Sequence, residues 1–244
     1  MTRGIGKEFM EKTQYKYLEP SDQNKGMPQP PLELPQDPEK AIIDLPKPSG
    51  IRVEYDLRKA VEGRRSVRSY SNKPLTMEEL SWLLWCTQGV KEEIGRPATL
   101  RTVPSAGARH AFETFLLANR VEGLRPGLYR FLAVEHKLQE VDMDRDIADR
   151  VTEGAYRQAM VKRAAATFIW VAVKYRMYWR YGERGYRYLH LDAGHVCQNL
   201  YLAAEAIGCG ACAIGAFYDE EINEVLHLDG EEQFVIYMAP VGKK

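Results

Sequence analysis

The longest helical pattern in the chain runs from Gly185 to Ile207. Apolar residues recur within it at helical spacing, namely Leu189, Ala193, Val196, Leu200, Ala203 and Ala204. Gly194 and several alanines keep one side thin enough for close packing. Gly208 follows at the position where a glycine ends a helix. We therefore predict one long helix that packs closely against its neighbours.

Several runs with strand character accompany this helix. Residues 166–175, ATFIWVAVKY, are rich in β-branched residues and suit a buried central strand. Residues 111–120 and 126–134 are separated by the turn VEGLRPG and predict a hairpin. Two shorter apolar runs, ACAIG and EQFVIYMAPVG, predict two more strands, the last of them ended by Pro240.

Shorter helices are predicted between these strands. Residues 55–63 form one, with Leu57, Ala60 and Val61 on one side and Gly63 as the cap. Thr76 and Glu79 form a capping box that opens a second, closed by Gly89. A third runs from Asp144 to about Val161 with Tyr156 on its apolar side, and a fourth begins with Asp219 as N-cap. This mixture predicts an α+β fold around one mixed sheet.

Composition narrows the classes of function. The 244 residues carry 34 basic and 34 acidic side chains, so no overall field attracts nucleic acid or an anionic membrane. A chain of this length with 45% hydrophobic residues favours one large domain. The first residues lack the apolar core of a secretory signal, and Thr167–Val173 is far shorter than a membrane span of roughly 20 residues. We expect a cytoplasmic protein.

The first 50 residues form a distinct segment. They carry most of the chain's 13 prolines, many charges and little periodicity, which predicts an extended arm ahead of a domain at 51–244. The arm is either disordered or wraps over a neighbouring subunit, with Ile42, Ile43 and Leu45 as its anchors. The sequence does not choose between these.

Cysteines and histidines indicate neither a metal site nor a histidine base. Cys209 and Cys212 form a single C-x-x-C without the further ligands that zinc requires and without the strand-to-helix context of a redox pair. His190 and His195 lie five residues apart, so they do not share a helix face as two metal-binding histidines do. We predict structural thiols.

Three stretches are candidates for chemistry. EGRRSVRSY places Arg64, Arg65 and Arg68 beside Ser66 where a helix ends. This is either a solvated surface or a phosphate site, since guanidinium groups grip two phosphate oxygens at once. PSAGARH, residues 104–110, is either an ordinary loop or one whose small side chains admit a flat ligand. GCGACAIGAF contains Gly-x-Gly after a helix rather than after a strand, which excludes a dinucleotide fingerprint.

Taken in order, these motifs resemble the nitroreductase-like FMN flavoprotein family, nearest to its SagB-type dehydrogenases. The resemblance rests on RRSVRSYSNKPLT, PSAG, the helix HLDAGHVCQNLYLAAEAIG, CAIGAF and a terminal PVGKK, and covers about residues 51–244. It implies a nitroreductase-like fold with a central, mostly antiparallel sheet flanked by helices. It also implies an intertwined homodimer with FMN at the subunit interface.

The resemblance further implies how the cofactor is held. Arg64, Arg65 and Ser66 bind the FMN phosphate, Arg68 lies toward the ribityl chain and the pyrimidine edge, and Lys243 is a further phosphate candidate. Pro104, Ser105, Ala106 and Gly107 touch the isoalloxazine from the partner chain. Ile214, Gly215 and Ala216 present backbone N–H groups near N5. Hydride transfer at N5 needs no side-chain nucleophile, so no catalytic residue is assigned.

The implied function is an FMN-dependent oxidoreductase that moves two electrons between NAD(P)H and an organic small molecule. The resemblance leaves open a SagB-type dehydrogenase of azoline-like substrates and an FMN carrier or sensor without turnover. An unrelated protein that binds a phosphorylated metabolite at the arginines is a further alternative. Relatives continue S-A-G as A-L-Y-P, whereas this chain places Arg109 and His110 there. Tyr178 and Trp179, in the aromatic and basic run 175–190, are candidates for stacking a substrate, and a plain surface loop is the alternative.

Overall fold

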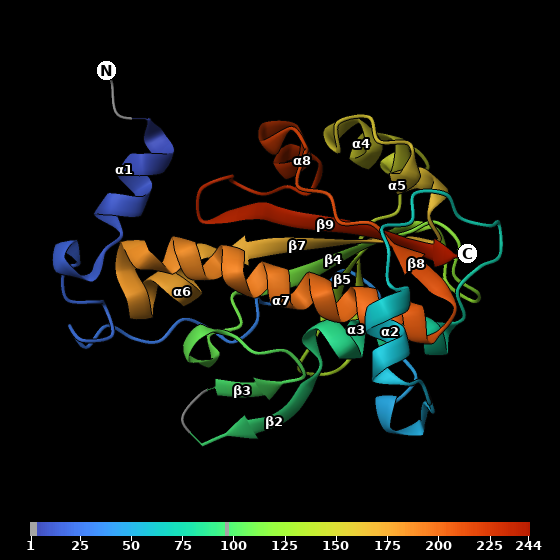
Figure 1. The fold of residues 1–244 in the computed structure, drawn as a ribbon, viewed down its shortest axis with the longest axis horizontal. Coiled ribbons are helices and arrows are strands. Elements are labelled where there is room, and N and C mark those ends of the chain that lie inside the picture. Colours follow the sequence, from blue (N-terminus) through green and yellow to red (C-terminus); the bar gives the residue numbers. More distant parts are fainter. Residues whose placement is uncertain (1–3, 96–97) are drawn as a thin grey trace.

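The strand Ala166–Val173 (β7) is an inner strand of a seven-stranded sheet in the computed structural model, which describes residues 4–95 and 98–244 (Figure 1). Its side chains alternate between two buried faces. Phe168 and Trp170 join the core on one side, and Ile169 and Val171 join the core on the other. Because helices cover both faces, the strand is apolar at nearly every position. The predicted buried central strand is confirmed.

The strands of the sheet follow the order β1-β6-β5-β4-β7-β9-β8, and each of its ladders is antiparallel. Their bounds are β1 Ile42–Asp44, β4 Phe112–Ala118, β5 Gly127–Leu132, β6 Lys137–Asp142, β8 Cys209–Ala211 and β9 Gln233–Lys243. A separate hairpin joins β2 Val90–Ile94 to β3 Ala98–Arg101. The predicted hairpin forms as β4 and β5. Parallel pairing is limited, among the described residues, to two isolated bridges.

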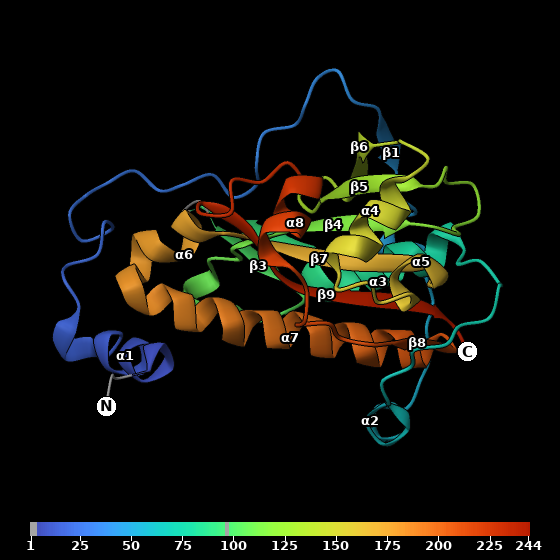
Figure 2. The same ribbon diagram turned by 90° about the horizontal axis from the view of Figure 1, so that it is seen from above.

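Helices form a layer on each face of the sheet (Figures 1 and 2). The helices are α1 Ile5–Lys12, α2 Leu57–Gly63, α3 Met77–Gln88, α4 Ile147–Gly154, α5 Met160–Arg163, α6 Lys174–Tyr181, α7 Gly185–Ala206 and α8 Asp219–Val225. Side chains of α3 and α7 belong to one core, and those of α4, α5 and α8 to the other. The α+β fold is therefore confirmed. No helix in the described part of the chain is both long and apolar enough to cross a membrane.

The helix boundaries follow local chemistry. Thr76 accepts from the backbone of Glu79 while the Glu79 side chain accepts from Thr76, so the predicted capping box is present at α3. Gly89 closes that helix. Gly208 adopts φ +70° just beyond α7, a conformation that glycine reaches without steric cost. The long helix is therefore bounded as predicted.

Three predicted boundaries are wrong. The helix from Asp144 to about Val161 is broken, because Tyr156 and Arg157 adopt φ +57° and +55° between α4 and α5. Tyr156 is consequently exposed rather than on a buried side. Pro240 does not end the last strand, which continues to Lys243. Its missing N–H faces the side where β8 has already ended, so no ladder bond is lost. Helix α8 begins at Asp219 itself, after an N-cap at Tyr218.

Two predictions about exposed segments also need correction. In α2 only Ala60 is buried, whereas Leu57 and Val61 are exposed, so this helix does not bury its predicted apolar side. Residues 175–190 do not form a surface loop. They form α6, a short 3₁₀ turn and the start of α7, because aromatic side chains of this run pack into the core.

The N-terminal arm runs along its own chain. Residues 42–44 add the edge strand β1 to β6, and Leu45 is buried, so all three expected anchors lie in or beside a strand of this subunit. Farther upstream, α1 lies beside the beginning of α7 (Figure 2). Arg184 and Arg187 donate to backbone carbonyls of Thr13 and Met10 at the end of α1, where the helix dipole favours cations. Within one chain the arm is thus docked by specific polar bonds.

The middle of the arm is held by a buried ion pair. Arg176 donates to Glu113 at 2.5 Å, and both side chains are almost completely buried, with 3% and 2% of their surface exposed. Glu113 also accepts from the backbone N–H of Leu34, and Arg176 donates to the carbonyl of Pro31. Each charge therefore has both an opposite charge and an arm backbone group as partners.

Replacing Glu113 with glutamine should destabilise the fold strongly. The change leaves the Arg176 guanidinium buried without its counter-charge, which typically costs about 3–5 kcal/mol in free energy of unfolding. Urea unfolding of Glu113→Gln measures this. Glu122→Gln makes the same chemical change at an exposed site. It is the control and should stay within about 0.5 kcal/mol of the parent in free energy of unfolding. Equal stability of the two variants would contradict the assignment.

Stability should also fall as the pH drops below about 6.5. Burial lowers the pKa of His110 to about 3, so in the window between these values the unfolded chain takes up a proton that the folded chain does not. The expected loss is at most about 1.4 kcal/mol per pH unit from this residue. Denaturation across pH 4–7 should therefore be less steep in pH for His110→Asn than for His227→Asn, an exposed control that lies away from α7. An unchanged slope in His110→Asn would rule this out.

Candidate functional site

One face of α7 borders a cavity of about 490 Å³. His190 and Gly194, four positions apart, line it from the helix. Tyr201 follows Gly194 by seven positions, so helical periodicity places it on the same face. The far wall is Phe234–Tyr237 of β9, with Gly215 and Phe217 at the rim. From His190 to Tyr201 the helix rises about 16 Å. We call the surface from this cavity to Tyr201 the α7 groove.

The arginine cluster lies at the Tyr201 end of the α7 groove. The guanidinium of Arg64 lies over the Tyr201 ring, 5.2 Å from its centre. The Ser66 hydroxyl is 3.0 Å from the Tyr201 hydroxyl, which also accepts from the backbone N–H of Ala213 at 2.8 Å. Either hydroxyl of the Ser66–Tyr201 pair can be the donor, because a hydroxyl oxygen can accept two hydrogen bonds. Tyr201 therefore fixes the loop after α2 against the segment after β8.

The three arginines have unused binding capacity. Arg65 and Arg68 are exposed and Arg64 is half-buried. Among the described residues, none of the three lies within ion-pair distance of a carboxylate, although α2 itself contains the pair Arg58–Glu62. Three cations and a hydroxyl within five consecutive residues form a donor set that suits a phosphate.

The segment after β8 supplies hydrogen-bond donors at the cavity end of the α7 groove. Ile214 is buried, and its backbone exchanges hydrogen bonds with Met238 at 2.8 and 3.1 Å. Gly215 and Ala216 are exposed, and within the described chain their backbone N–H groups donate to no other group. A side chain at Gly215 would only touch the Tyr237 ring at 3.8 Å, so the backbone is open to a ligand.

Lys243, the other phosphate candidate, is engaged elsewhere. Its ammonium group contacts the Glu79 carboxylate and the carbonyl of Ile207. Glu79 is the residue that completes the capping box of α3, so the contact joins the last strand to the start of that helix. Lys243 would have to leave this ion pair to reach a phosphate at Arg64.

The loop Pro104–Gly107 lies on the opposite side of α7. The Asp192 carboxylate accepts from the backbone N–H of Ala106 at 3.2 Å, and Asp192 points about half a turn away from Gly194. The Ser105 hydroxyl accepts from the backbone of His110, which closes the loop on itself. Gly107 has φ +58°, and a side chain there would collide with Arg180 and Tyr181. Within one chain, α7 separates this loop from the α7 groove.

The four candidates for substrate contact are mostly covered. His110 and Trp179 are buried, and the Trp179 indole donates to the carbonyl of Met27 in the arm. Tyr178 lines a small hollow with arm residues 17–22. The Arg109 guanidinium lies over the Trp179 ring at 5.4 Å and donates to the Gly107 carbonyl, so it stays beside the loop. Only Arg109 is placed where a ligand of that loop could meet it.

Sequence reasoning missed Tyr201, Asp192 and Gly194 as parts of the site. All three lie in the motif HLDAGHVCQNLYLAA, where they were counted only as parts of a helix. Their spacing carries a usable signal, because Gly194 and Tyr201 fall on one face and Asp192 falls on the other. What remained hidden was which loop each face meets.

Metal and thiol chemistry find no support in the described residues, which contain no group of three or more histidine, cysteine or acidic side chains able to hold an ion. All four cysteines are free. Burial raises the pKa of Cys197 to about 12 and that of Cys209 to about 11, so neither is a reactive thiolate at neutral pH.

Comparison with known proteins identifies the family of this chain. Residues 61–243 match the model of the Nitroreductase family, which leaves the arm outside the match. A protein of Methanocaldococcus jannaschii that is named as a nitroreductase is 37% identical over 203 residues, covering 83% of this chain and 96% of that protein.

Solved structures agree with the family match. A nitroreductase from Anabaena variabilis has 32% identity and a TM-score of 0.66; the match covers 77% of this chain and only 38% of that one. The fold is also similar to that of the NADPH:FMN oxidoreductase from Vibrio harveyi, solved with NAD+, at a TM-score of 0.55 and 17% identity over 77% of this chain and 68% of the other. This chain belongs to the nitroreductase family.

Proposed function

We propose that the protein is an FMN-dependent oxidoreductase whose electron donor is a reduced nicotinamide and whose acceptor is an organic small molecule. The observation that carries this is the α7 groove, with an uncompensated arginine cluster at one end and free backbone N–H groups at the other. An extended flavin mononucleotide has a dianionic phosphate at one end and a flat polar ring at the other, which matches these two groups of donors. The family supports an oxidoreductase, and the finer assignment is ours.

The donor set fits each end of the cofactor. Arg64, Arg65 and Ser66 would hold the phosphate, while Arg68 would lie toward the ribityl chain and the pyrimidine edge of the ring. When bound, FMN supplies two-electron chemistry by accepting or giving a hydride at N5. The N–H groups of Gly215 and Ala216 would hold the ring edge at N5 without a side chain in the way. Gly194 leaves the helix side of the groove open.

A second copy of the chain completes the site in this proposal. The ring is expected to touch both Gly215 and the loop Pro104–Gly107, yet α7 stands between them in one subunit. Leu191, His195 and Gln198 form the exposed front of that helix, between the groove and the loop. A two-fold dimer that meets at this front would bring the loop of each subunit to the groove of the other. The relative named as an NADPH:FMN oxidoreductase supports the choice of donor.

Cofactor content is the first test. The purified protein should bind FMN, show flavin absorption and release FMN on denaturation. Anaerobic mixing with NADH or NADPH should then bleach the flavin bands. Bound FMN that no nicotinamide reduces would favour a carrier without turnover, and a protein that refuses added FMN would overturn the proposal.

Arg64→Ala should weaken FMN binding by about 1.5–3 kcal/mol, or roughly ten- to hundredfold in dissociation constant, because a charged hydrogen bond to the phosphate is lost. Fluorescence titration of the apoprotein measures this. Arg58→Ala, at an exposed arginine of α2, the helix that ends just before Arg64, is the matched control and should bind FMN normally. Equal affinities in the two variants would mean that the phosphate lies elsewhere.

Gly194→Ala should have opposite effects on folding and on binding. Alanine is favoured over glycine inside a helix by about 1 kcal/mol and meets no atom within 4 Å here, so the apoprotein should melt at a higher temperature. The new methyl group projects into the α7 groove and should lower FMN affinity. Gly6→Ala, in α1, is the control that leaves FMN binding unchanged. An unaltered FMN affinity in Gly194→Ala would show that the flavin ring does not lie in this groove.

A further inference from the structure

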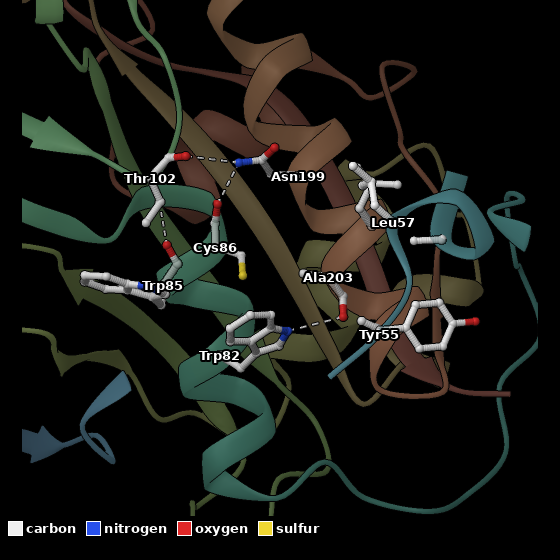
Figure 3. Close-up of a pocket in the computed structure, with 11 residues that line it drawn as sticks. Tyr55, Leu57, Trp82, Trp85, Cys86, Thr102, Asn199 and Ala203 are labelled. Atoms are coloured by element: carbon white, nitrogen blue, oxygen red, sulfur yellow. Dashed lines mark hydrogen bonds between the residues drawn. The ribbon is translucent and has the colours of Figure 1, made fainter. Parts of the chain in front are cut away.

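The loop Pro104–Gly107 is held in place by polar side chains on one face of α7. Asn199 donates to the carbonyls of Cys86 and Thr102, at 2.9 and 3.5 Å, just before the loop begins (Figure 3). Asp192 lies seven residues earlier on the same face of the helix and accepts from a backbone N–H inside the loop. The residues that follow the loop therefore start from a backbone that a long helix keeps in position.

Two arginines meet at Gly107, the last residue of this loop. The Nε–H of Arg109 donates to the Gly107 carbonyl at 3.1 Å. Arg180, from α6, is equally close, because a Cβ atom at Gly107 would come within 2.6 Å of its Nε and within 2.4 Å of the Tyr181 hydroxyl. Both arginines are half-buried, so solvent and solutes still reach them. Two accessible cations thus share one glycine as their neighbour.

Neutral groups, rather than carboxylates, orient Arg180. Its Nε–H donates to the Tyr181 hydroxyl at 3.2 Å, and a terminal N–H donates to the side-chain oxygen of Gln23 in the arm at 3.3 Å. A guanidinium has five N–H donors, so three remain without a partner in the part of the chain that the structure describes. No carboxylate in that part pairs with Arg180, whereas Arg176, one turn earlier, is paired with Glu113. Arg180 is therefore oriented but not neutralised.

Arg109 is oriented by an aromatic ring. Its guanidinium lies over the Trp179 ring, 5.4 Å from the centre. The indole is itself fixed, since its N–H donates to the carbonyl of Met27 in the arm. The Asp192 carboxylate, which contacts this loop, is engaged by the loop's backbone and adds a single negative charge. The surroundings of Gly107 consequently keep a net positive charge.

We propose that Arg109 and Arg180 together bind the carboxylate of the organic acceptor, so that the protein acts on anionic small molecules. This rests on the proposed function and extends it to the class of substrate. A guanidinium grips both oxygens of a carboxylate, and an anion between two guanidiniums offsets their mutual repulsion. The cofactor phosphate has its own arginines at the Tyr201 end of the α7 groove, so this second pair is left for the other reactant.

The position of the pair suits an acceptor that reacts at the flavin. In the proposed dimer the loop of one subunit touches the ring bound in the groove of the other. An anion held beside Gly107 would therefore lie at the edge of that ring, with the rest of the molecule directed across its face. Tyr181, next to Arg180, adds an aromatic surface on which a ring of the acceptor can pack. A neutral acceptor lacks the contact with the arginines and should bind more weakly.

The test compares 4-nitrobenzoate with 4-nitrobenzyl alcohol, a neutral molecule of similar shape, as acceptors for the FMN-loaded protein. Reduction of the nitro group to a nitroso group takes a hydride from the reduced nicotinamide and a proton from solvent, and releases water. The KM should be at least about tenfold lower for 4-nitrobenzoate. Arg180→Gln and Arg109→Gln should each raise that KM about tenfold or more, because a charged hydrogen bond is lost. The KM for the alcohol and both kcat values should stay nearly unchanged.

Two further variants serve as controls. Arg145→Gln removes an exposed arginine between β6 and α4 and should leave both KM values as in the parent. Arg180→Lys keeps the charge but loses the forked pair of donors, so its KM for 4-nitrobenzoate should lie between those of the parent and Arg180→Gln. An unchanged KM for 4-nitrobenzoate in both glutamine variants would overturn the inference, as would an equal rise for the two acceptors.

Binding without turnover gives a second readout. Calorimetry should show that benzoate binds the parent at least about tenfold more tightly than benzamide, its neutral counterpart, and that Arg180→Gln loses this preference. Equal affinities of the two ligands for the parent would overturn the inference, and this comparison decides even if a variant does not fold. A protein that binds no FMN, or whose FMN no nicotinamide reduces, would instead overturn the proposed function. The calorimetric comparison would still decide whether the arginines bind a carboxylate.

Discussion

Helix α7 is the element on which both the fold and the candidate site depend. Its buried side packs against the central sheet and contributes Leu189, Val196 and Leu200 to the core. The same 22-residue helix presents Gly194 and Tyr201 on one flank and Asp192 on the other. A straight helix cannot turn two opposite flanks toward one ligand. The geometry of α7 therefore sets the requirement that a ligand touching both flanks draws on two chains.

Charge is distributed in two contrasting ways around this helix. Arg176 is buried and matched by Glu113 together with backbone groups of the arm, as a buried guanidinium must be. Arg64, Arg65 and Arg68 remain accessible to solvent and have no acidic partner among the described residues. In a chain with no net charge, such a local excess is where an anion binds most favourably. The hydrogen bond between the Ser66 and Tyr201 hydroxyls holds the backbone between these arginines against α7.

The arm illustrates what local pattern leaves undetermined. Its prolines predicted an extended arm over residues 1–50, but they did not predict that β1 would join β6 or that Glu33 would accept from the backbone of Ala133 and Val134. Both contacts join residues roughly a hundred positions apart in sequence. Likewise, the sequence offered Trp179 as a candidate for stacking a substrate but did not predict that its indole would donate to the carbonyl of Met27 in the arm. The family model matches only from residue 61 onward, so it says nothing about the path of the arm.

By itself, the sequence determined the features that arise within one element: the capping box of α3, the length of α7, the alternation of β7 and the gathering of three arginines after Gly63. It also predicted the family, because these motifs occur in a characteristic order. Only the tertiary structure decided which side of α7 meets the Pro104–Gly107 loop, that Lys243 pairs with Glu79, and that α2 leaves Leu57 and Val61 exposed. The physical reason is that periodicity fixes the direction of a side chain within its helix or strand, whereas its neighbours come from distant segments through packing.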